Sequence, residues 1–283
     1  MTLAERLHAA RAQLTASGVR AEEAAVDVDL YARTLLGWDR ARLIADQREP
    51  VPSELEPRFS AWLERRANGE PSAYIVGIRE FWGLEFEVSP AVLIPRPETE
   101  LLVEEVLLLL HQVVGPRVAD IGTGSGNIAV SIARERMDAH VVATDISAEA
   151  LALAMKNAAR HGVGERIEFI TASYLGGVEG DFDLIAANPP YVRRGDKPAL
   201  ARDVKHEPDV ALFGGDSGLQ NIAGVLDTAE AKLRSAGWLV MEFGCGQEDD
   251  VRALVAARGS LRLERIREDL QGIPRTAIMQ KHG

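Results

Sequence analysis

The sequence predicts an α/β protein in which a parallel, doubly wound sheet with helices on both faces follows a helical domain and a hairpin. Strand-like and helix-like segments alternate from Arg117 onward, which is typical of a parallel sheet. Residues 1–70 instead show apolar residues at helical spacing. Residues 71–95 are rich in aromatic and β-branched residues, interrupted by glycine and proline. We therefore expect an N-terminal domain at 1–70, a hairpin linker at 71–95 and an α/β domain at 96–283.

Residues 1–70 are predicted to form a small all-helical N-terminal domain. Apolar side chains recur at helical spacing in its first segment, at Leu3, Leu7, Ala10 and Leu14. Two further helices are expected at 21–36 and 53–66. No strand signal competes with them, so the connecting β-hairpin at 71–95 is the first predicted β structure.

The α/β domain is predicted to begin with a helix at 97–111. Pro97 suits a first helical turn, and Glu98 and Glu100 favour its positive end. Seven strands follow, predicted from apolar and β-branched runs at 117–122, 140–146, 166–172, 182–188, 237–244, 261–268 and 275–281. Four helices alternate with the strands, at 127–136, 148–162, 219–233 and 248–259.

Composition excludes several classes of protein. Of 283 residues, 46% are hydrophobic, enough for an ordinary globular core. With 32 basic and 43 acidic side chains the net charge is −11, so the chain lacks the overall charge of a non-specific nucleic-acid binder. The start of the chain shows no apolar signal core, and the most apolar run, Val106 to Leu110, is too short to span a bilayer. We expect a cytoplasmic monomer that binds neither membrane nor nucleic acid directly.

Cysteine and histidine carry no sign of redox or metal chemistry. The one cysteine, Cys245, excludes an intramolecular disulfide, and we expect a buried thiol without a catalytic role. The six histidines show no metal-ligand spacing, so no metal site is expected.

A glycine-rich stretch, DIGTGSG, lies between the first strand of the α/β domain and the helix that follows. Such a position lets a ligand approach the backbone and the free N–H groups of the helix start. Asn127 occupies the last position of the dinucleotide pattern, so a smaller adenosine ligand is favoured over a pyrophosphate cofactor. Asp145 ends the second strand, where an acid can accept hydrogen bonds from ribose hydroxyls or simply cap a helix. Asp120 faces the ligand's amino group or holds the loop.

The stretch NPPY, Asn188 to Tyr191, ends the fourth strand, so it should face the same crevice as the glycine loop. The Asn188 side-chain oxygen and the Pro189 carbonyl could accept hydrogen bonds from the two N–H groups of a planar amino group. The prolines fix φ and aim the carbonyls in advance, and Tyr191 could form a wall beside a positively charged methyl donor. The alternative is a rigid turn that ends the strand.

The DIGTGSG stretch, Asp145 and NPPY together resemble the S-adenosylmethionine-dependent methyltransferases, which have a seven-stranded Rossmann-like methyltransferase sheet. The segments IPRPETE, DVKHEPDVALFGGDSGL and DLQGIPRTAIMQ are similar to the bacterial peptide chain release factor N5-glutamine methyltransferase family. This resemblance implies methyl transfer from S-adenosyl-L-methionine to the glutamine of the Gly-Gly-Gln motif in class 1 release factors. The products are N5-methylglutamine and S-adenosyl-L-homocysteine.

The same resemblance implies site residues. Catalysis falls to Asn188, Pro189 and Tyr191, and the substrate glutamine is held by Asn188 to Tyr191, with Pro190 included. Tyr174 lies against the adenine, at a position where many members have tryptophan. Cofactor binding is expected at Asp120, Gly122, Thr123, Gly124, Ser125, Gly126, Asp145, Tyr174 and Asn188.

Three other functions remain open from the sequence. An adenine-N6 methyltransferase acting on nucleic acid would share the NPPY chemistry, although the acidic charge argues against it. A glutamine methyltransferase acting on a ribosomal protein is a closer alternative, and the RPETE form favours the release factor. A nucleotide-binding regulator without catalysis would not need NPPY. Arg96, Glu98 and Glu100 either line the substrate entrance or fix the start of a helix, and the loop at 193–206 is a candidate lid.

Overall fold

The computed structural model describes residues 1–282 and divides the chain into two compact units. The first unit comprises Met1–Gly77 and Ala201–His206, and the second comprises Ile78–Leu200 and the chain from Glu207 onward. Among the residues described, no helix is both long and apolar enough to cross a membrane.

The first unit is helical, as predicted. The apolar positions of its first helix, Leu3, Leu7, Ala10 and Leu14, are all buried. Thr2 and Glu5 form a capping box at the start of this helix. The helices are α1 (Leu3–Ala16), α2 (Ala21–Leu36), α3 (Arg40–Ala45), the 3-10 turn η1 (Asp46–Arg48), α4 (Arg58–Ala67) and α5 (Ser72–Val76).

Two helix boundaries in this unit differ from the prediction. The helix expected from residue 53 begins at Arg58 instead, because Pro57 disfavours helical backbone at the residue before it. Helix α5 occupies the start of the predicted hairpin linker, where Gly77 ends it in a left-handed conformation. The antiparallel β-hairpin itself is confirmed, with strands β1 (Ile78–Phe81) and β2 (Leu84–Glu87).

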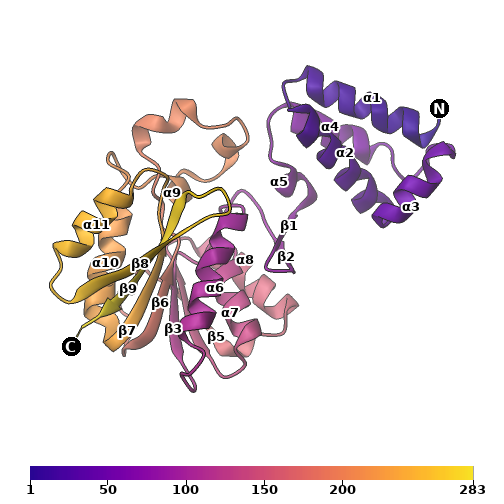
Figure 1. The fold of residues 1–283 in the computed structure, drawn as a ribbon. Coiled ribbons are helices and arrows are strands. Elements are labelled where there is room, and N and C mark those ends of the chain that lie inside the picture. Colours follow the sequence, from indigo (N-terminus) through magenta and orange to yellow (C-terminus); the bar gives the residue numbers. More distant parts are fainter. Residues whose placement is uncertain (283) are drawn as a thin grey trace. The chain divides into compact units, whose positions relative to one another are not determined.

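The second unit contains the seven predicted strands in a single sheet of order β5-β4-β3-β6-β7-β9-β8 (Figure 1). The strands are β3 (Arg117–Ile121), β4 (His140–Asp145), β5 (Ile167–Thr171), β6 (Phe182–Ala187), β7 (Leu233–Glu242), β8 (Leu261–Glu268) and β9 (Pro274–Lys281). The parallel order predicted from the alternation of strands and helices extends from β5 to β7, and β9 runs antiparallel to both β7 and β8. Only a short turn separates β8 from β9, and a parallel pair needs a much longer crossover.

Helices cover both faces of the sheet, as predicted, and each face has its own core. One core contains buried residues of α6 (Glu100–Leu109), α7 (Asn127–Glu135) and α8 (Ala148–Arg160). The other contains buried residues of α10 (Gln220–Lys232) and α11 (Glu248–Ala256) (Figure 1). The chain proceeds from β3 outward to β4 and β5, then returns to β6 on the opposite side of β3. This reversal makes the carboxyl ends of β3 and β6 the expected ligand crevice.

Short helical segments connect the longer elements. Pro97 begins the 3-10 turn η2 (Pro97–Thr99), which leads directly into α6. The remaining short helices of the second unit are η3 (Gly164–Arg166), η4 (Arg194–Ala199) and α9 (Asp209–Leu212), and η5 (Val204–His206) belongs to the first unit.

Candidate active site

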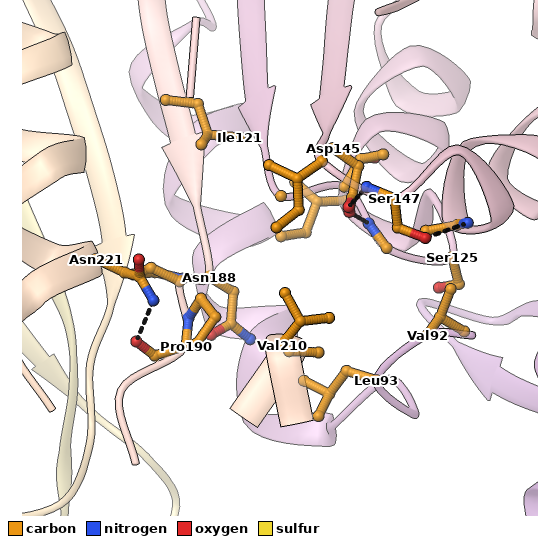
Figure 2. Close-up of a pocket in the computed structure, with 18 of the residues that line it drawn as sticks. Val92, Leu93, Ile121, Ser125, Asp145, Ser147, Asn188, Pro190, Val210 and Asn221 are labelled. Atoms are coloured by element: carbon orange, nitrogen blue, oxygen red, sulfur yellow. Dashed lines mark hydrogen bonds between the residues drawn. The ribbon is translucent and has the colours of Figure 1, made fainter. Parts of the chain in front are cut away.

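A cavity of about 510 Å³ opens at the carboxyl ends of β3, β4 and β6, entirely within the second unit. This volume is typical of small-molecule sites. Figure 2 shows Ser125, Asp145 and Ser147 on one side of the cavity and Asn188 and Pro190 on the other. The structure therefore brings the glycine loop, the acid and the NPPY segment to one site.

The glycine loop wraps around the end of β4 through backbone hydrogen bonds. The N–H groups of Gly122 and Thr123 both donate to the Thr144 carbonyl, at 2.8 and 2.9 Å. Gly122 and Gly124 have φ values of 73° and 55°, conformations that side chains rarely tolerate. Of the predicted cofactor-binding residues from Gly122 to Gly126, all but Gly126 line the cavity.

Gly126 has a packing role. It caps α7 with φ 81°, and a Cβ placed on it would lie 3.0 Å from the Cβ of Ala154 on α8. Glycine is therefore needed where the start of α7 approaches α8.

Asp145 is held in a fixed orientation at the edge of the cavity. Its Oδ2 accepts a hydrogen bond from the Gly124 N–H and its Oδ1 accepts one from the Ser147 N–H, both at 2.9 Å (Figure 2). Each carboxylate oxygen has a second acceptor site, so the group can still bind a pair of ribose hydroxyls. The helix-capping alternative belongs to Ser147, whose hydroxyl accepts from the N–H of Ala150.

Asp120 does not line the cavity and instead forms hydrogen bonds that hold the glycine loop in place. It is fully buried, and its Oδ2 accepts hydrogen bonds from the Thr123 hydroxyl at 2.6 Å and the Ala129 N–H at 3.1 Å. Burial raises the pKa of this carboxyl to about 7, opposed by the two hydrogen bonds. Of the two roles predicted for Asp120, the geometry favours holding the loop.

Tyr174 lines the cavity in a strained backbone conformation, with φ 52°. Its ring lies close to Gly224 of α10, where an added Cβ would meet the ring at 2.3 Å. Its hydroxyl donates to Oδ1 of Asn221 at 3.3 Å. The ring is thus fixed at the cavity wall, in a position suited to packing against a flat ligand.

The carbonyls of the NPPY segment differ in what they bind. Nδ2 of Asn221 donates to the Pro190 carbonyl at 3.4 Å (Figure 2), and Nε2 of Gln247 donates to the Tyr191 carbonyl at 3.1 Å. Among the described residues, no donor reaches the Pro189 carbonyl or Oδ1 of Asn188. These two oxygens are therefore the free acceptors at this side of the cavity.

Tyr191 takes a different place from the predicted wall. It is absent from the residues that line the cavity, and its ring lies beside Gly244. Its hydroxyl donates to Oε1 of Glu242 at 3.3 Å, and burial raises the pKa of the phenol. Its side chain therefore holds the NPPY segment in place from the side that faces away from the cavity.

Several residues in or next to the cavity were not predicted from the sequence. Asn221 orients the Pro190 carbonyl, and Asn157 on α8 donates to the Ser125 carbonyl at 2.8 Å. Thr99 donates to the buried Glu242 at 2.6 Å. The signal available for Glu242 was a charged residue in the otherwise apolar strand GWLVMEFG.

Some residues of the RPETE segment and of the 193–206 loop line the cavity, and others hold neighbouring segments in place. Arg96 lines the cavity and pairs with the buried Glu207, whose other oxygen accepts the Ile94 N–H at 3.0 Å. Glu100 accepts the Trp82 N–H at 2.7 Å, which fixes the hairpin turn. Arg194 lines the cavity at the start of the loop.

The expectation of a buried Cys245 is wrong, because its side chain is exposed beyond the end of β7.

Comparison with known proteins decides the family. A model described as the PrmC N-terminal domain matches residues 5–77, and one described as the methyltransferase small domain matches residues 97–211. A release factor glutamine methyltransferase of Bradyrhizobium diazoefficiens is 38% identical, covering 99% of this chain and 93% of its own. One of Moorella thermoacetica is 40% identical, covering 96% of each chain.

The chain belongs to the release factor glutamine methyltransferase family. It is therefore a methyltransferase, a class that uses S-adenosylmethionine.

Solved structures agree on the fold. The catalytic domain of hMettl16, bound to an RNA hairpin of MAT2A, has a TM-score of 0.61 and 16% identity, covering 76% of this chain and 84% of that one. A methyltransferase from Pyrococcus furiosus has a TM-score of 0.53 and 19% identity, covering 80% and 100%. At these identities the likeness shows the methyltransferase fold alone.

Proposed function

We propose that this protein transfers a methyl group from S-adenosylmethionine to the side-chain amide nitrogen of glutamine in the Gly-Gly-Gln motif of class 1 release factors. The observation that carries the proposal is the pair of free acceptors, Oδ1 of Asn188 and the Pro189 carbonyl, in the cavity that also holds the glycine loop and Asp145. The relatives that match nearly the whole chain are named for this activity. Methylating a release factor would modulate translation termination and would take place in the cytoplasm, with the protein acting as a monomer.

The residues of the cavity fit S-adenosylmethionine. Asp145 offers acceptors to ribose hydroxyls, and the loop from Gly122 to Ser125 offers a close backbone surface. Tyr174 and Ile146 give the flat and apolar surface that an adenine needs. When bound, this cofactor supplies a methyl group on a positively charged sulfur.

The substrate amide is activated by its orientation. A glutamine side-chain nitrogen shares its lone pair with the neighbouring carbonyl and is a poor nucleophile. With its two N–H groups donating to Asn188 and the Pro189 carbonyl, the nitrogen can become tetrahedral with its lone pair facing the methyl donor. The two oxygens also match the positive charge that develops on nitrogen, so positioning and electrostatic complementarity provide the catalysis. Once the nitrogen has taken the methyl group, with S-adenosylhomocysteine as the other product, it loses one of its protons to solvent and becomes a neutral amide again.

The choice of glutamine over adenine is testable by competition. We expect label from S-adenosylmethionine to appear on purified release factor and to be absent from duplex DNA and RNA in the same mixture. A matched release factor in which the motif glutamine is replaced by alanine should remain unlabelled. Label on nucleic acid, with none on the release factor, would support the adenine alternative.

We further propose that residues 1–70 recognise the body of the release factor, that 71–95 link the domains and that 96–283 carry out methyl transfer. A protein substrate offers far more surface than one side chain, and the helical unit has a core of its own to support a recognition surface. The full chain should therefore show a higher kcat/KM with whole release factor than with a short Gly-Gly-Gln peptide. A variant lacking residues 1–70 should lose this difference, and an unchanged ratio would contradict the recognition role.

A further inference from the structure

A chain of hydrogen bonds leads from the NPPY segment into the core. Nδ2 of Asn188 donates to Oγ1 of Thr99 at 3.1 Å, and the Thr99 hydroxyl donates to Oε2 of Glu242 at 2.6 Å. The other oxygen of Glu242 accepts the Tyr191 hydroxyl at 3.3 Å. Thr99 is 2% exposed and Glu242 is 1% exposed, so water does not compete for these groups.

The direction of this chain decides which atom of Asn188 is available to a ligand. The two ends of a carboxamide are nearly identical in shape, so its hydrogen-bond partners set its orientation. Thr99 has one hydroxyl hydrogen, and an ionised Glu242 can only accept, so that hydrogen is directed to Glu242. Thr99 then presents a lone pair to Asn188, which only the NH2 end of the amide can satisfy.

Glu242 lowers the stability of the fold at this position, which suggests that it has a role in the site. Its strand is otherwise apolar, and burying a carboxyl there costs stability. Arg275 lies near enough to act on Glu242, but its hydrogen bond is with Asp269, at 3.0 Å. The two hydrogen bonds that Glu242 makes both go to groups next to the cavity.

We propose that Thr99 and Glu242 are positioning residues that hold the Asn188 amide with its oxygen free to accept the substrate N–H. The assignment rests on the proposed methylation of an amide nitrogen, because that reaction needs an acceptor at Asn188 and not a donor. Tyr191 contributes through the same carboxyl, and so the predicted importance of this tyrosine is explained although it lies outside the cavity wall.

Protonation of Glu242 would reverse the chain. Burial raises the pKa of this carboxyl to about 7, with Glu98 raising it further and Thr99, Tyr191 and Arg275 opposing the shift. A protonated Glu242 can donate to Thr99, which frees the Thr99 hydrogen to donate to a rotated Asn188 amide. The side-chain oxygen of Asn188 would then accept the Thr99 hydrogen and would no longer be free for the substrate. We therefore expect turnover to fall as the pH drops through about 7.

The test compares Thr99→Val with Thr99→Ser. Valine has the shape of threonine without the hydroxyl, and serine keeps the hydroxyl. With whole release factor as substrate, we expect kcat of Thr99→Val to fall about tenfold, the effect of one neutral hydrogen bond. Thr99→Ser should retain kcat within about threefold. The dissociation constant for S-adenosylmethionine, measured by calorimetry, should stay unchanged in both.

A double-mutant cycle separates positioning from a general structural role. If Thr99 acts through Asn188, Thr99→Val should cause no further loss of kcat in the Asn188→Ala background. An equal loss in both backgrounds, or wild-type turnover by Thr99→Val, would overturn the assignment. Wild-type protein that methylates no release factor would overturn the proposed function as well.

Glu242→Gln gives a second measurement that does not depend on how well Thr99→Val folds. The glutamine side-chain oxygen can still accept the Thr99 hydrogen, and the group stays neutral at every pH. We expect the variant to lose the decline in kcat that the wild type shows through about pH 7. An identical pH profile in the two proteins would refute the role of Glu242.

Discussion

Replacing Asn188 with alanine removes one of the two acceptors that we propose for the substrate amide. The structure indicates little effect on folding, because the lost hydrogen bond joins Nδ2 to the Thr99 hydroxyl at 3.1 Å and Thr99 keeps its bond to Glu242. A neutral hydrogen bond of this kind contributes about 1 kcal/mol to the free energy of unfolding. The fold should therefore survive the substitution.

The effect on turnover should be much larger. The Asn188 oxygen faces a nitrogen that gains positive charge during methyl transfer, and losing a partner of this kind costs about 3–4 kcal/mol in the transition state. That corresponds to a loss of roughly 10²–10³ in kcat. The Pro189 carbonyl remains, so activity should be reduced and not abolished.

Single-turnover methyl transfer at saturating cofactor measures this loss directly, with thermal melting as a check on the fold. Asn221→Ala is a matched control, because it removes the same atoms from the same cavity. Its amide reaches the Pro190 carbonyl at 3.4 Å and does not face the substrate, so we expect a loss below about tenfold. Turnover of a folded Asn188→Ala within about threefold of wild type would refute the assigned role.

Three further outcomes are expected. Asp145→Asn should weaken S-adenosylmethionine binding by roughly 10- to 100-fold in calorimetry, because a charged acceptor for ribose is lost; equal affinity would contradict this role. Gly126→Ala should lower the free energy of unfolding more than Gly162→Ala. Both glycines have positive φ, but only Gly126 lacks room for a Cβ, so equal losses would contradict the packing role. Glu242 has its pKa raised from 4.5 to about 7, so its contribution to stability is fully present below pH 4.5 and is lost as pH rises to 7. Relative to Glu242→Gln, wild type should lose on the order of 3 kcal/mol over this range in chemical unfolding, and parallel curves would contradict the shift.

Local sequence patterns predicted most of the fold. The apolar runs marked all seven strands of the sheet. The central strands β3, β4 and β6 bury nearly continuous stretches of side chains, whereas β8 alternates apolar with charged residues. The alternation of strands and helices alone does not indicate the reversed direction of β9, since strand direction depends on the connection and not on the strand's own residues. Strand β7 also begins at Leu233, before the predicted residue 237, because Phe182 pairs with Leu233 across a bulge.

The site was predictable only where motifs carry it. The glycine loop from Gly122 and Asn188 each follow a strand directly, and Asp145 ends one, so their meeting at one edge of the sheet follows from the fold. Thr99 and Glu242 are 143 positions apart, and no local pattern indicates that they touch. The placement of Tyr191 behind the cavity likewise depends on tertiary packing against the residues after β7.

The most direct test of the central claim is to locate the transferred methyl group. The protein is incubated with S-adenosylmethionine and a class 1 release factor, and the Gly-Gly-Gln peptide is then sequenced by tandem mass spectrometry. We predict one methyl group, on the side-chain nitrogen of the motif glutamine, and none in the sample with Asn188→Ala at matched short times. A methyl group on another residue, or an unmodified glutamine with fully active cofactor and folded protein, would contradict the account.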